Sequence, residues 1–282
     1  MNTDLIIDRL NEYLITSKQE EINALKEIYQ EIALAALARS DFFKIGAFHG
    51  GTCLRIVHGL RRFSEDLDFQ LIKPQKNFEW HSFLVAMKLE FKSFGLTITV
   101  KDRSKAEGVI KKAFLKQGSF GQILELKHPV LSSDKQSILI KLEIDTNPPE
   151  GSSFESHFLQ YPFPFSITTQ DQPSLFAGKL HALLYRGYLK GRDWFDFLWY
   201  ISKKTPINYT LLGSALVQTD PNLSTSLPIT RGWLVNKFDT QIRTIDWHKA
   251  RFDVQPFLTN ANQKMLDAWS QDLFLAMLEK LP

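Results

Sequence analysis

Two carboxylates separated by one residue stand in a short apolar stretch of the chain. Asp66 and Asp68 enclose Leu67 and are followed by Phe69. Strand side chains alternate between two faces, so both acids are predicted to point the same way. Acids are depleted in strands, and Mg²⁺ prefers carboxylate oxygens together with phosphate oxygens of a substrate. We therefore predict that Asp66 and Asp68 bind Mg²⁺; the alternative is a pair of surface acids at a strand edge.

A glycine turn precedes this acid pair. Gly50, Gly51 and Thr52 join a predicted strand at 43–47 to a predicted helix at 52–60. Glycines let backbone N–H groups approach a phosphate, and a helix N-terminus favours an anion. A plain strand-turn-helix connection also uses glycine, but the neighbouring acids favour phosphate binding. A Walker pattern is absent. A phosphate-binding turn and a metal-binding acid pair are what transfer of a nucleotidyl group requires.

A third acid is expected on a later strand. Lys141, Glu143 and Asp145 alternate and therefore share one strand face. Either Glu143 or Asp145 could complete the metal site and help activate an attacking hydroxyl in a two-metal scheme. The same alternation is ordinary for a solvent-facing strand.

A second group of charged residues lies in the helical part of the sequence. Lys179 stands in the apolar stretch FAGKLHALLY and could reach a triphosphate as a point charge, or extend to the surface at a domain boundary. His181 is predicted on the opposite side, where a packing role is expected. Asp193 and Asp196 share a helical face. They could orient Lys179 or Arg192, contact the base or ribose, or be ordinary acids of a first helical turn.

Further residues around the acid pair carry weaker predictions. Arg62 could screen phosphate or pair with Glu65. By the alternation of the predicted strand, Ser64 shares the face of Asp66 and Asp68. Modification of its hydroxyl would then repel a triphosphate, although a local backbone hydrogen bond is the simpler role. The basic residues within 101–116 could follow an RNA backbone or form a solvated edge.

The order of these motifs resembles a known superfamily. The first motif of DNA polymerase β-like nucleotidyltransferases resembles a pattern in this chain: Gly50-Gly51-Thr52, thirteen residues, and then Asp66-Leu67-Asp68-Phe69. In that superfamily Gly-Ser is more frequent than the Gly-Thr found here. The stretch GLRRFSEDLDF is similar to the AbiEii-type nucleotidyltransferase toxins of bacterial type IV toxin–antitoxin and phage-defence systems. Lys141-Leu142-Glu143-Ile144 resembles the strand of the third carboxylate. AGKLHA followed by RDWFD, at 177–182 and 192–196, resembles the helical motif of this family.

The resemblance implies an α+β fold. We expect a polymerase β-like mixed sheet with flanking helices over residues 1–165, and a helical C-terminal domain over 166–282. The cleft between the two domains is expected to hold the nucleotide, since ligand sites favour such junctions.

The resemblance also implies an activity, which is Mg²⁺-dependent transfer of NMP from an NTP to an acceptor hydroxyl by a toxin that a partner antitoxin neutralises. In some relatives the acceptor is the 3′ end of tRNA. The implied metal ligands are Asp66, Asp68 and Glu143, with Asp145 as the alternative. Lys179 is expected to be catalytic, and the implied nucleotide contacts are Gly50, Gly51, Thr52, Arg62, Lys179, Asp193 and Asp196. Two alternatives stay open: a small-molecule or protein hydroxyl as acceptor, and a non-catalytic NTP- or RNA-binding regulator.

Composition sets the remaining bounds. The 282 residues are 44% apolar and 23% charged, as in ordinary globular proteins, and the net charge of +3 does not demand nucleic acid. The single Cys53 excludes an intramolecular disulfide and fits a reducing compartment. No long apolar run or signal peptide is recognisable, so we expect a cytoplasmic protein without a membrane span.

The remaining elements follow from periodicity and turn residues. A long helix is predicted over 3–38, and the Pro- and Gly-rich turn at 147–151 is predicted to end the sheet, with a proline-containing loop after it. The other predicted strands are 63–72, 96–102, 113–115, 122–128 and 137–144. The other predicted helices are 77–94, 174–189, 192–203, 209–218, 230–236, 247–252 and 261–279.

Overall fold

The computed structural model describes residues 3–102, 119–127, 137–220, 223 and 229–282. The chain divides into two compact units. The first, here the sheet unit, comprises Met1–Gly59, Phe63–Pro148 and Glu155–Thr169. The second, here the helical unit, comprises Leu60–Arg62, Pro149–Phe154 and Gln170–Pro282. The strand predicted at 113–115 and most of the basic stretch 101–116 lie outside the described residues.

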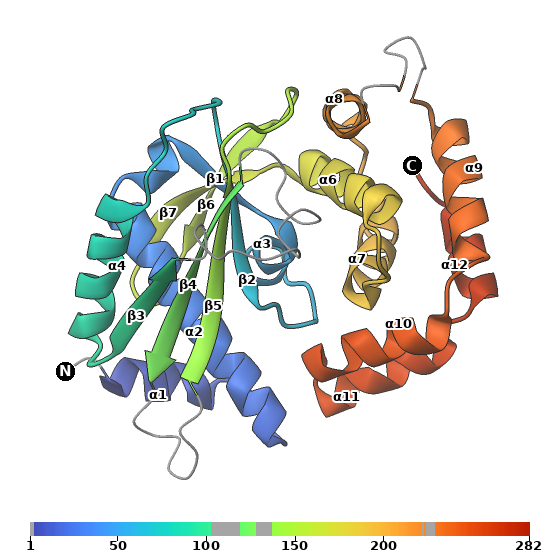
Figure 1. Ribbon diagram of the computed structural model, residues 1–282. Coiled ribbons are helices and arrows are strands. Elements are labelled where there is room, and N and C mark those ends of the chain that lie inside the picture. Colours follow the sequence, from blue (N-terminus) through green and yellow to red (C-terminus); the bar gives the residue numbers. More distant parts are fainter. Residues whose placement is uncertain (1–2, 103–118, 128–136, 221–222, 224–228) are drawn as a thin grey trace. The chain divides into compact units, whose positions relative to one another are not determined.

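A mixed sheet forms the centre of the sheet unit (Figure 1). Its strands follow the order β3-β4-β5-β2-β1-β7-β6. Strand β2 is antiparallel to β1 and parallel to β5, so the predicted mixed α+β sheet is confirmed. The strand bounds are β1 (Gly46–His49), β2 (Asp66–Leu71), β3 (Thr97–Asp102), β4 (Ser119–Lys127), β5 (Ser137–Asp145), β6 (Phe154–Leu159) and β7 (Phe165–Gln170).

The acid-bearing strand β2 is fixed by its apolar residues. Leu67, Phe69 and Leu71 are almost fully buried, whereas Asp66 and Asp68 on the other face are half-buried. The Phe69 ring meets Phe42 edge-on at 5.0 Å between centroids. A shift of one residue would exchange the two faces and expose this aromatic core, so burial sets the direction in which the acids point.

Helix α2 (Lys18–Arg39) is the main core helix of the sheet unit and packs on β5 and on α4 (His81–Ser93). The predicted helix over 3–38 is interrupted, because α1 (Thr3–Asn11) ends well before α2 begins. Ser17 caps α2 by accepting a hydrogen bond from the Glu20 backbone N–H at 3.2 Å. The Glu20 carboxylate in turn accepts from the Thr16 N–H at 2.6 Å. The sequence Ser-Lys-Gln-Glu is a capping-box pattern, which starts a new helix at this point.

The prediction that the sheet ends near 147–151 is wrong. Strands β6 and β7 follow that turn, and β7 runs parallel to β1 with Phe48 opposite Thr169. Pro162 and Pro164 lie between the two strands and therefore remove no hydrogen bond from the interior of the sheet. The predicted strand at 43–47 is a 3-10 turn, Phe42–Lys44, followed by β1.

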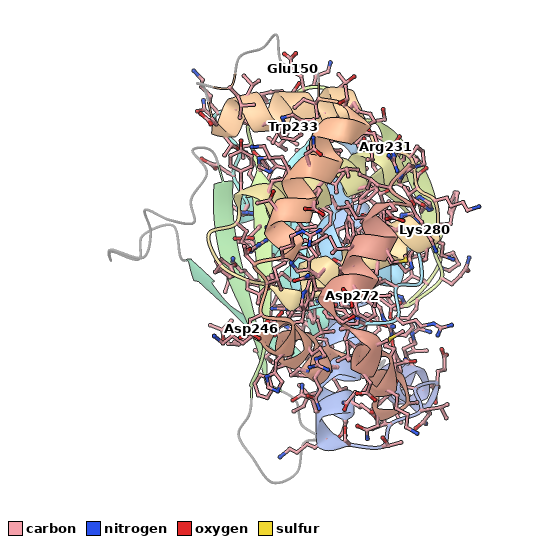
Figure 2. The ribbon with its side chains drawn as sticks, turned by 90° about the vertical axis from the view of Figure 1, so that its right-hand side faces the viewer. Glu150, Arg231, Trp233, Asp246, Asp272 and Lys280 are labelled. Atoms are coloured by element: carbon pink, nitrogen blue, oxygen red, sulfur yellow. The ribbon has the colours of Figure 1, made fainter. Side chains whose placement is uncertain are left out.

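Seven α-helices and two 3-10 turns make up the described part of the helical unit. The helices are α6 (Gln172–Tyr185), α7 (Gly191–Ser202), α8 (Tyr209–Thr219), α9 (Arg231–Ile242), α10 (Trp247–Val254), α11 (Asn260–Gln263) and α12 (Gln271–Leu278). The helix predicted over 261–279 is divided, because Ser270 caps α12 by accepting from the Leu273 N–H at 3.2 Å. Arg231, labelled with Lys280 in Figure 2, donates from its Nε to the Leu281 carbonyl at 2.7 Å.

Aromatic packing and a close contact between the start of α7 and helix α10 fix the position of helix α7. Trp194 is almost fully buried and meets Phe274 edge-on at 5.6 Å, while Trp247 stacks on Phe274 at 3.9 Å. A Cβ at Gly191 would lie 1.9 Å from the Ala250 carbonyl oxygen, so only glycine allows α7 to begin this close to α10. None of the helices in the described residues has the length and apolar character that crossing a bilayer requires.

Candidate active site

The strand register brings two of the predicted acids together. In the parallel pairing of β2 and β5, Asp68 lies beside Glu143 and Asp66 beside Lys141. Adjacent strands are about 4.8 Å apart, and side chains at paired positions share a face. Asp66, Asp68 and Glu143 therefore form a group of three carboxylates on one face of the sheet. We name Asp66, Asp68 and Glu143 the acid cluster.

Lys141 belongs to the same face. Its Nζ forms an ion pair with a Glu143 carboxylate oxygen. Burial opposes the lysine charge, but the hydrogen bond and charge of Glu143 and the charges of Asp66 and Asp68 outweigh it and raise the pKa of Lys141. The ammonium group is thus an internal cation for the acid cluster. Three carboxylates around one lysine leave an excess of negative charge on this face, which favours a cation.

Asp145 has a different environment. It pairs in register with Gln70, further along β2 than Asp68. Its Oδ1 accepts a hydrogen bond from the Asn147 backbone N–H at 3.0 Å, which closes the turn after β5. Of the two alternatives for a third acid, the register brings Glu143 rather than Asp145 beside Asp68.

The glycine turn lies against the acid cluster. Gly50 has a positive φ of 79°, and a Cβ built there would be 2.5 Å from Asp68 Oδ2. Glycine is therefore required both by the backbone conformation and by the nearby carboxylate. Thr52 is fully buried, and its hydroxyl donates to the Asp66 backbone carbonyl. This bond fastens helix α3 (Gly50–Ile56) to β2, so any phosphate contact of Thr52 would use its backbone N–H.

Ser64 precedes the strand and is not part of it. Strand β2 begins at Asp66, so the alternation argument does not reach Ser64. The Ser64 carbonyl accepts from Gln30 Nε2 at 3.2 Å. Its neighbour Glu65 forms an ion pair with Lys26 at 3.4 Å.

In the helical unit, the predicted charged residues form a buried ion-pair network. Lys179 Nζ lies 2.6 Å from Asp193 Oδ1 and 2.9 Å from Asp196 Oδ2. Arg62 donates two hydrogen bonds to Asp196, at 2.7 Å and 2.6 Å. The Asp196 side chain is fully buried and that of Arg62 is 3% exposed. Two parallel N–H···O bonds of this kind fix both orientation and distance.

Arg186 completes this network and was not predicted from the sequence. Its Nε lies 3.0 Å from Asp193 Oδ2. Arg186 follows Lys179 by seven residues, or two helical turns, which is the spacing that could have revealed it. Three cations thus face two carboxylates, so the network has a net positive charge.

Electrostatics keep Asp193 ionised. Burial would raise the pKa of Asp193, but the charges of Lys179, Lys190 and Arg186 outweigh it and lower that pKa. Burial lowers the pKa of Lys190. We name Lys179, Asp193, Asp196, Arg62 and Arg186 the ion-pair network.

Two neighbouring residues lie outside the network. Arg192 approaches Asp253 at 3.7 Å and lies over the Phe257 ring at 4.1 Å, while both aspartates of α7 contact Lys179. His181 is buried and its Nε2 is 2.8 Å from the Thr219 hydroxyl. This agrees with a packing role for His181.

The acid cluster fits a hard divalent cation. Its donors are carboxylate oxygens on two neighbouring strands, and the lack of a Cβ at Gly50 lets the Asp68 carboxylate lie against the glycine turn. Mg²⁺ is usually held by one or two carboxylates plus substrate phosphates, which matches this arrangement. The site can therefore combine metal binding with phosphate binding by a glycine turn.

Comparisons with known proteins identify the family of the chain. The family model described as nucleotidyl transferase AbiEii toxin, type IV TA system, matches residues 32–278. A candidate nucleotidyltransferase from Helicobacter pylori is similar at 18% identity and a TM-score of 0.48, covering 95% of this chain and 99% of that chain. The JHP933 protein of Helicobacter pylori is similar at 18% identity and a TM-score of 0.47, covering 94% and 96%. Among curated proteins no match was found. Because the family model spans most of its length, the chain belongs to the AbiEii family of nucleotidyltransferase toxins of type IV toxin–antitoxin systems.

Proposed function

We propose that the acid cluster binds Mg²⁺ and that the protein transfers NMP from an NTP to an acceptor hydroxyl, with the 3′ ends of tRNA as the acceptor. The observation that carries the proposal is the register of β2 and β5, which places Glu143 beside Asp68 next to the Gly50 turn. In the reaction, the acceptor oxygen forms a bond to the α-phosphorus as the bond from this phosphorus to the β-phosphate oxygen breaks. The products are the modified acceptor and pyrophosphate.

Each part of the sheet unit has a proposed role. Asp66, Asp68 and Glu143 would hold the metal, which when bound neutralises phosphate charge and aligns the α-phosphate with the acceptor. The backbone N–H groups of the glycine turn would bind phosphate oxygens. Glu143 would also assist loss of the proton from the acceptor hydroxyl. In-line positioning and electrostatic stabilisation supply most of the rate in such transfers.

In the helical unit, we propose that Lys179 binds the triphosphate. Its side chain is 12% exposed, and two carboxylates hold it in one orientation. Asp193, Asp196 and Arg62 act as positioning residues, and the net positive charge of the network suits a polyanionic substrate. A contact of Asp193 or Asp196 with the base or ribose would need one of these short ion pairs to open.

The biological part of the proposal rests on the family. Membership of a type IV toxin–antitoxin family implies an antitoxin partner. The choice of tRNA comes from the resemblance to toxins that modify tRNA, and it places the reaction in the cytosol, where tRNA and NTPs are found. Modification of Ser64 as an off-switch remains a hypothesis, which a Ser64→Asp variant with full activity would contradict.

The test of this proposal identifies the acceptor directly. The purified protein is incubated with Mg²⁺, each α-labelled NTP in turn, and separate pools of tRNA, total protein and small metabolites, followed by mass spectrometry. We expect an added NMP mass on tRNA fragments carrying the 3′ end, and no addition with the Asp66→Ala variant. Addition only to a protein or a small molecule would refute tRNA as acceptor, and addition by Asp66→Ala at the wild-type rate would refute the assigned chemistry.

A further inference from the structure

A second group of metal-ligating side chains lies elsewhere in the sheet unit. His58, Glu155 and His157 each offer a ligand atom, and these three atoms lie within 4.8 Å of one another. His157 Nε2 is 2.9 Å from Glu155 Oε1. The rings of His58 and His157 meet edge to face with their centroids 5.3 Å apart. We name these three residues the histidine cluster.

Secondary structure explains why the three side chains converge. Glu155 and His157 are two residues apart on β6, so they point from the same face of this strand. His58 follows α3, and the next residue, Gly59, turns the chain with a φ of 72°. The cluster therefore links the end of α3 to β6, the last strand in the order of the sheet.

The donor set suits a different metal from the acid cluster. Two imidazoles and one carboxylate are typical of Zn²⁺, with about 2.0–2.2 Å from the metal to each donor. Donors around a tetrahedral ion of that size are about 3.4 Å apart, which the observed spacing reaches with small side-chain rotations. Mg²⁺ prefers oxygen donors and does not favour two imidazoles.

We propose that His58, Glu155 and His157 bind one Zn²⁺-class transition metal ion, which clamps the end of helix α3 to strand β6. The partial exposure of the Glu155 and His157 side chains, 39% and 29%, gives the ion a route to the cluster and leaves a coordination position for water. The clamp would act on the helix that begins at Gly50. The segment from Gly50 to His58 would thus connect the Gly50 turn to the histidine cluster. Eight residues at the rise of an α-helix span about 12 Å.

This inference does not depend on the proposed transfer reaction. The histidine cluster and the acid cluster share no residue, and β7 and β1 separate β6 from β2 in the sheet. An Asp68→Asn variant should lose transfer activity but bind Zn²⁺ with unchanged affinity and stoichiometry. Failure of one proposal would leave the other standing.

The test uses the full chain after treatment with EDTA. Zn²⁺ is titrated by calorimetry in the presence of excess Mg²⁺, and Co²⁺ is titrated by visible absorption. We expect one equivalent of Zn²⁺ to bind, a rise in the melting temperature, and Co²⁺ ligand-field bands of four- or five-coordinate intensity. The His157→Ala and His58→Ala variants should each bind at least about 10-fold more weakly and lose the melting-temperature rise.

A matched control distinguishes Zn²⁺ binding at the histidine cluster from binding at an exposed surface histidine. His248 is exposed on α10, and His248→Ala should bind Zn²⁺ like the wild type. X-ray absorption of the zinc-loaded wild type should show two imidazoles in the first coordination sphere, and this measurement needs no variant to fold. The proposal is overturned if the wild type binds no Zn²⁺, if the His58→Ala/His157→Ala double variant binds it equally well, or if absorption shows only oxygen ligands.

Discussion

At the residue scale, Gly50 is the position where a single methyl group should do most damage to activity. Its φ is 79°, and a Cβ would lie 2.5 Å from Asp68 Oδ2. Gly50→Ala must therefore displace the turn or the carboxylate. Because misplacement of about 1 Å can cost about 100-fold in rate, we expect a loss of that size in nucleotidyl transfer. Initial rates with labelled NTP measure it.

The control for this variant is a glycine at which an added Cβ would contact no other atom. Gly213 lies within α8, and a Cβ built there meets nothing within 4 Å. Gly213→Ala should keep full activity and gain up to about 1 kcal/mol in stability from helix propensity. Equal activity of Gly50→Ala and Gly213→Ala would show that the Gly50 turn is not part of the active site.

The third acid can be identified by two isosteric variants. Glu143 lies beside Asp68 in register, whereas Asp145 accepts a hydrogen bond that closes a turn. Glu143→Gln should lower the transfer rate by about 100-fold or more, since a metal ligand contributes several kcal/mol to the transition state. Asp145→Asn should stay within a few-fold, because an amide oxygen can still accept from the Asn147 N–H. The opposite order of the two rates would assign the role to Asp145.

The sequence could identify part of this chemistry and not the rest. Strand alternation and the apolar neighbours of Asp66 and Asp68 predict that both acids share a face, and the structure has them there. The bond between Arg62 and Asp196 joins residues 134 positions apart. No local pattern marks such a pair, so the sequence suggests only the nearby Glu65 as an acidic partner for Arg62.

At the element scale, the ion-pair network should hold α6 and α7 together. Asp196 is fully buried and binds both Arg62 and Lys179. Asp196→Asn would remove the carboxylate that binds the buried Arg62 and leave Lys179 paired with Asp193, and breaking a buried pair in this way costs about 3–5 kcal/mol. Urea denaturation should show this loss as a lower midpoint.

An exposed pair in the same unit provides the comparison. Arg243 and Asp239 are one turn apart at the end of α9, with side chains 54% and 41% exposed. Asp239→Asn should leave the urea midpoint almost unchanged, because solvent screens an exposed pair. If Asp196→Asn is equally mild, water must reach the network, and its proposed role in fixing Lys179 would be wrong.

The elements differ in how clearly the sequence marks them. Helices α6 to α8 have regular apolar periodicity and lie close to their predicted bounds. The interruption before α2 depends on one capping box, formed by Ser17 and Glu20. The periodicity of apolar residues does not reveal such a cap. Strands β6 and β7 were missed because the prolines around them indicate a loop, although those prolines stand outside the strands.

At the scale of the whole molecule, stability should depend on pH through Glu31. Burial raises the pKa of Glu31 to about 7, despite its bonds to Arg9, and the charge of Glu27 adds to the rise. The folded protein therefore keeps a proton that the unfolded chain, with a pKa of 4.5, releases. The stability from this group is complete below pH 4.5 and is lost as pH rises through about 7.

The Glu31→Gln variant removes this titration and retains an acceptor for Arg9. From pH 5 to pH 8, the free energy of unfolding should fall by about 1–3 kcal/mol more in the wild type than in the variant. Urea denaturation of both proteins at several pH values measures the difference. Parallel curves would mean that Glu31 is ionised in the folded protein.

The order of sheet and helices along the chain can be predicted from the sequence, whereas the boundary between the two units cannot. Motif order indicates a mixed sheet followed by helices, and the structure has this order. Leu60–Arg62 nevertheless belong to the helical unit, although residues of the sheet unit precede and follow them in sequence. Tertiary contacts such as the one between Arg62 and Asp196 tie these residues to the helical unit, and composition or spacing cannot reveal such contacts.

The central claim is that the acid cluster catalyses transfer of a nucleotidyl group, and the position of a label tests it most directly. The protein is given acceptor tRNA, Mg²⁺ and an NTP labelled at either the α- or the γ-phosphate, beside the Asp68→Asn variant. We predict that the α-label enters the acceptor with one equivalent of pyrophosphate, and that Asp68→Asn abolishes this transfer. Entry of the γ-label, or undiminished α-label transfer by Asp68→Asn, would contradict the account.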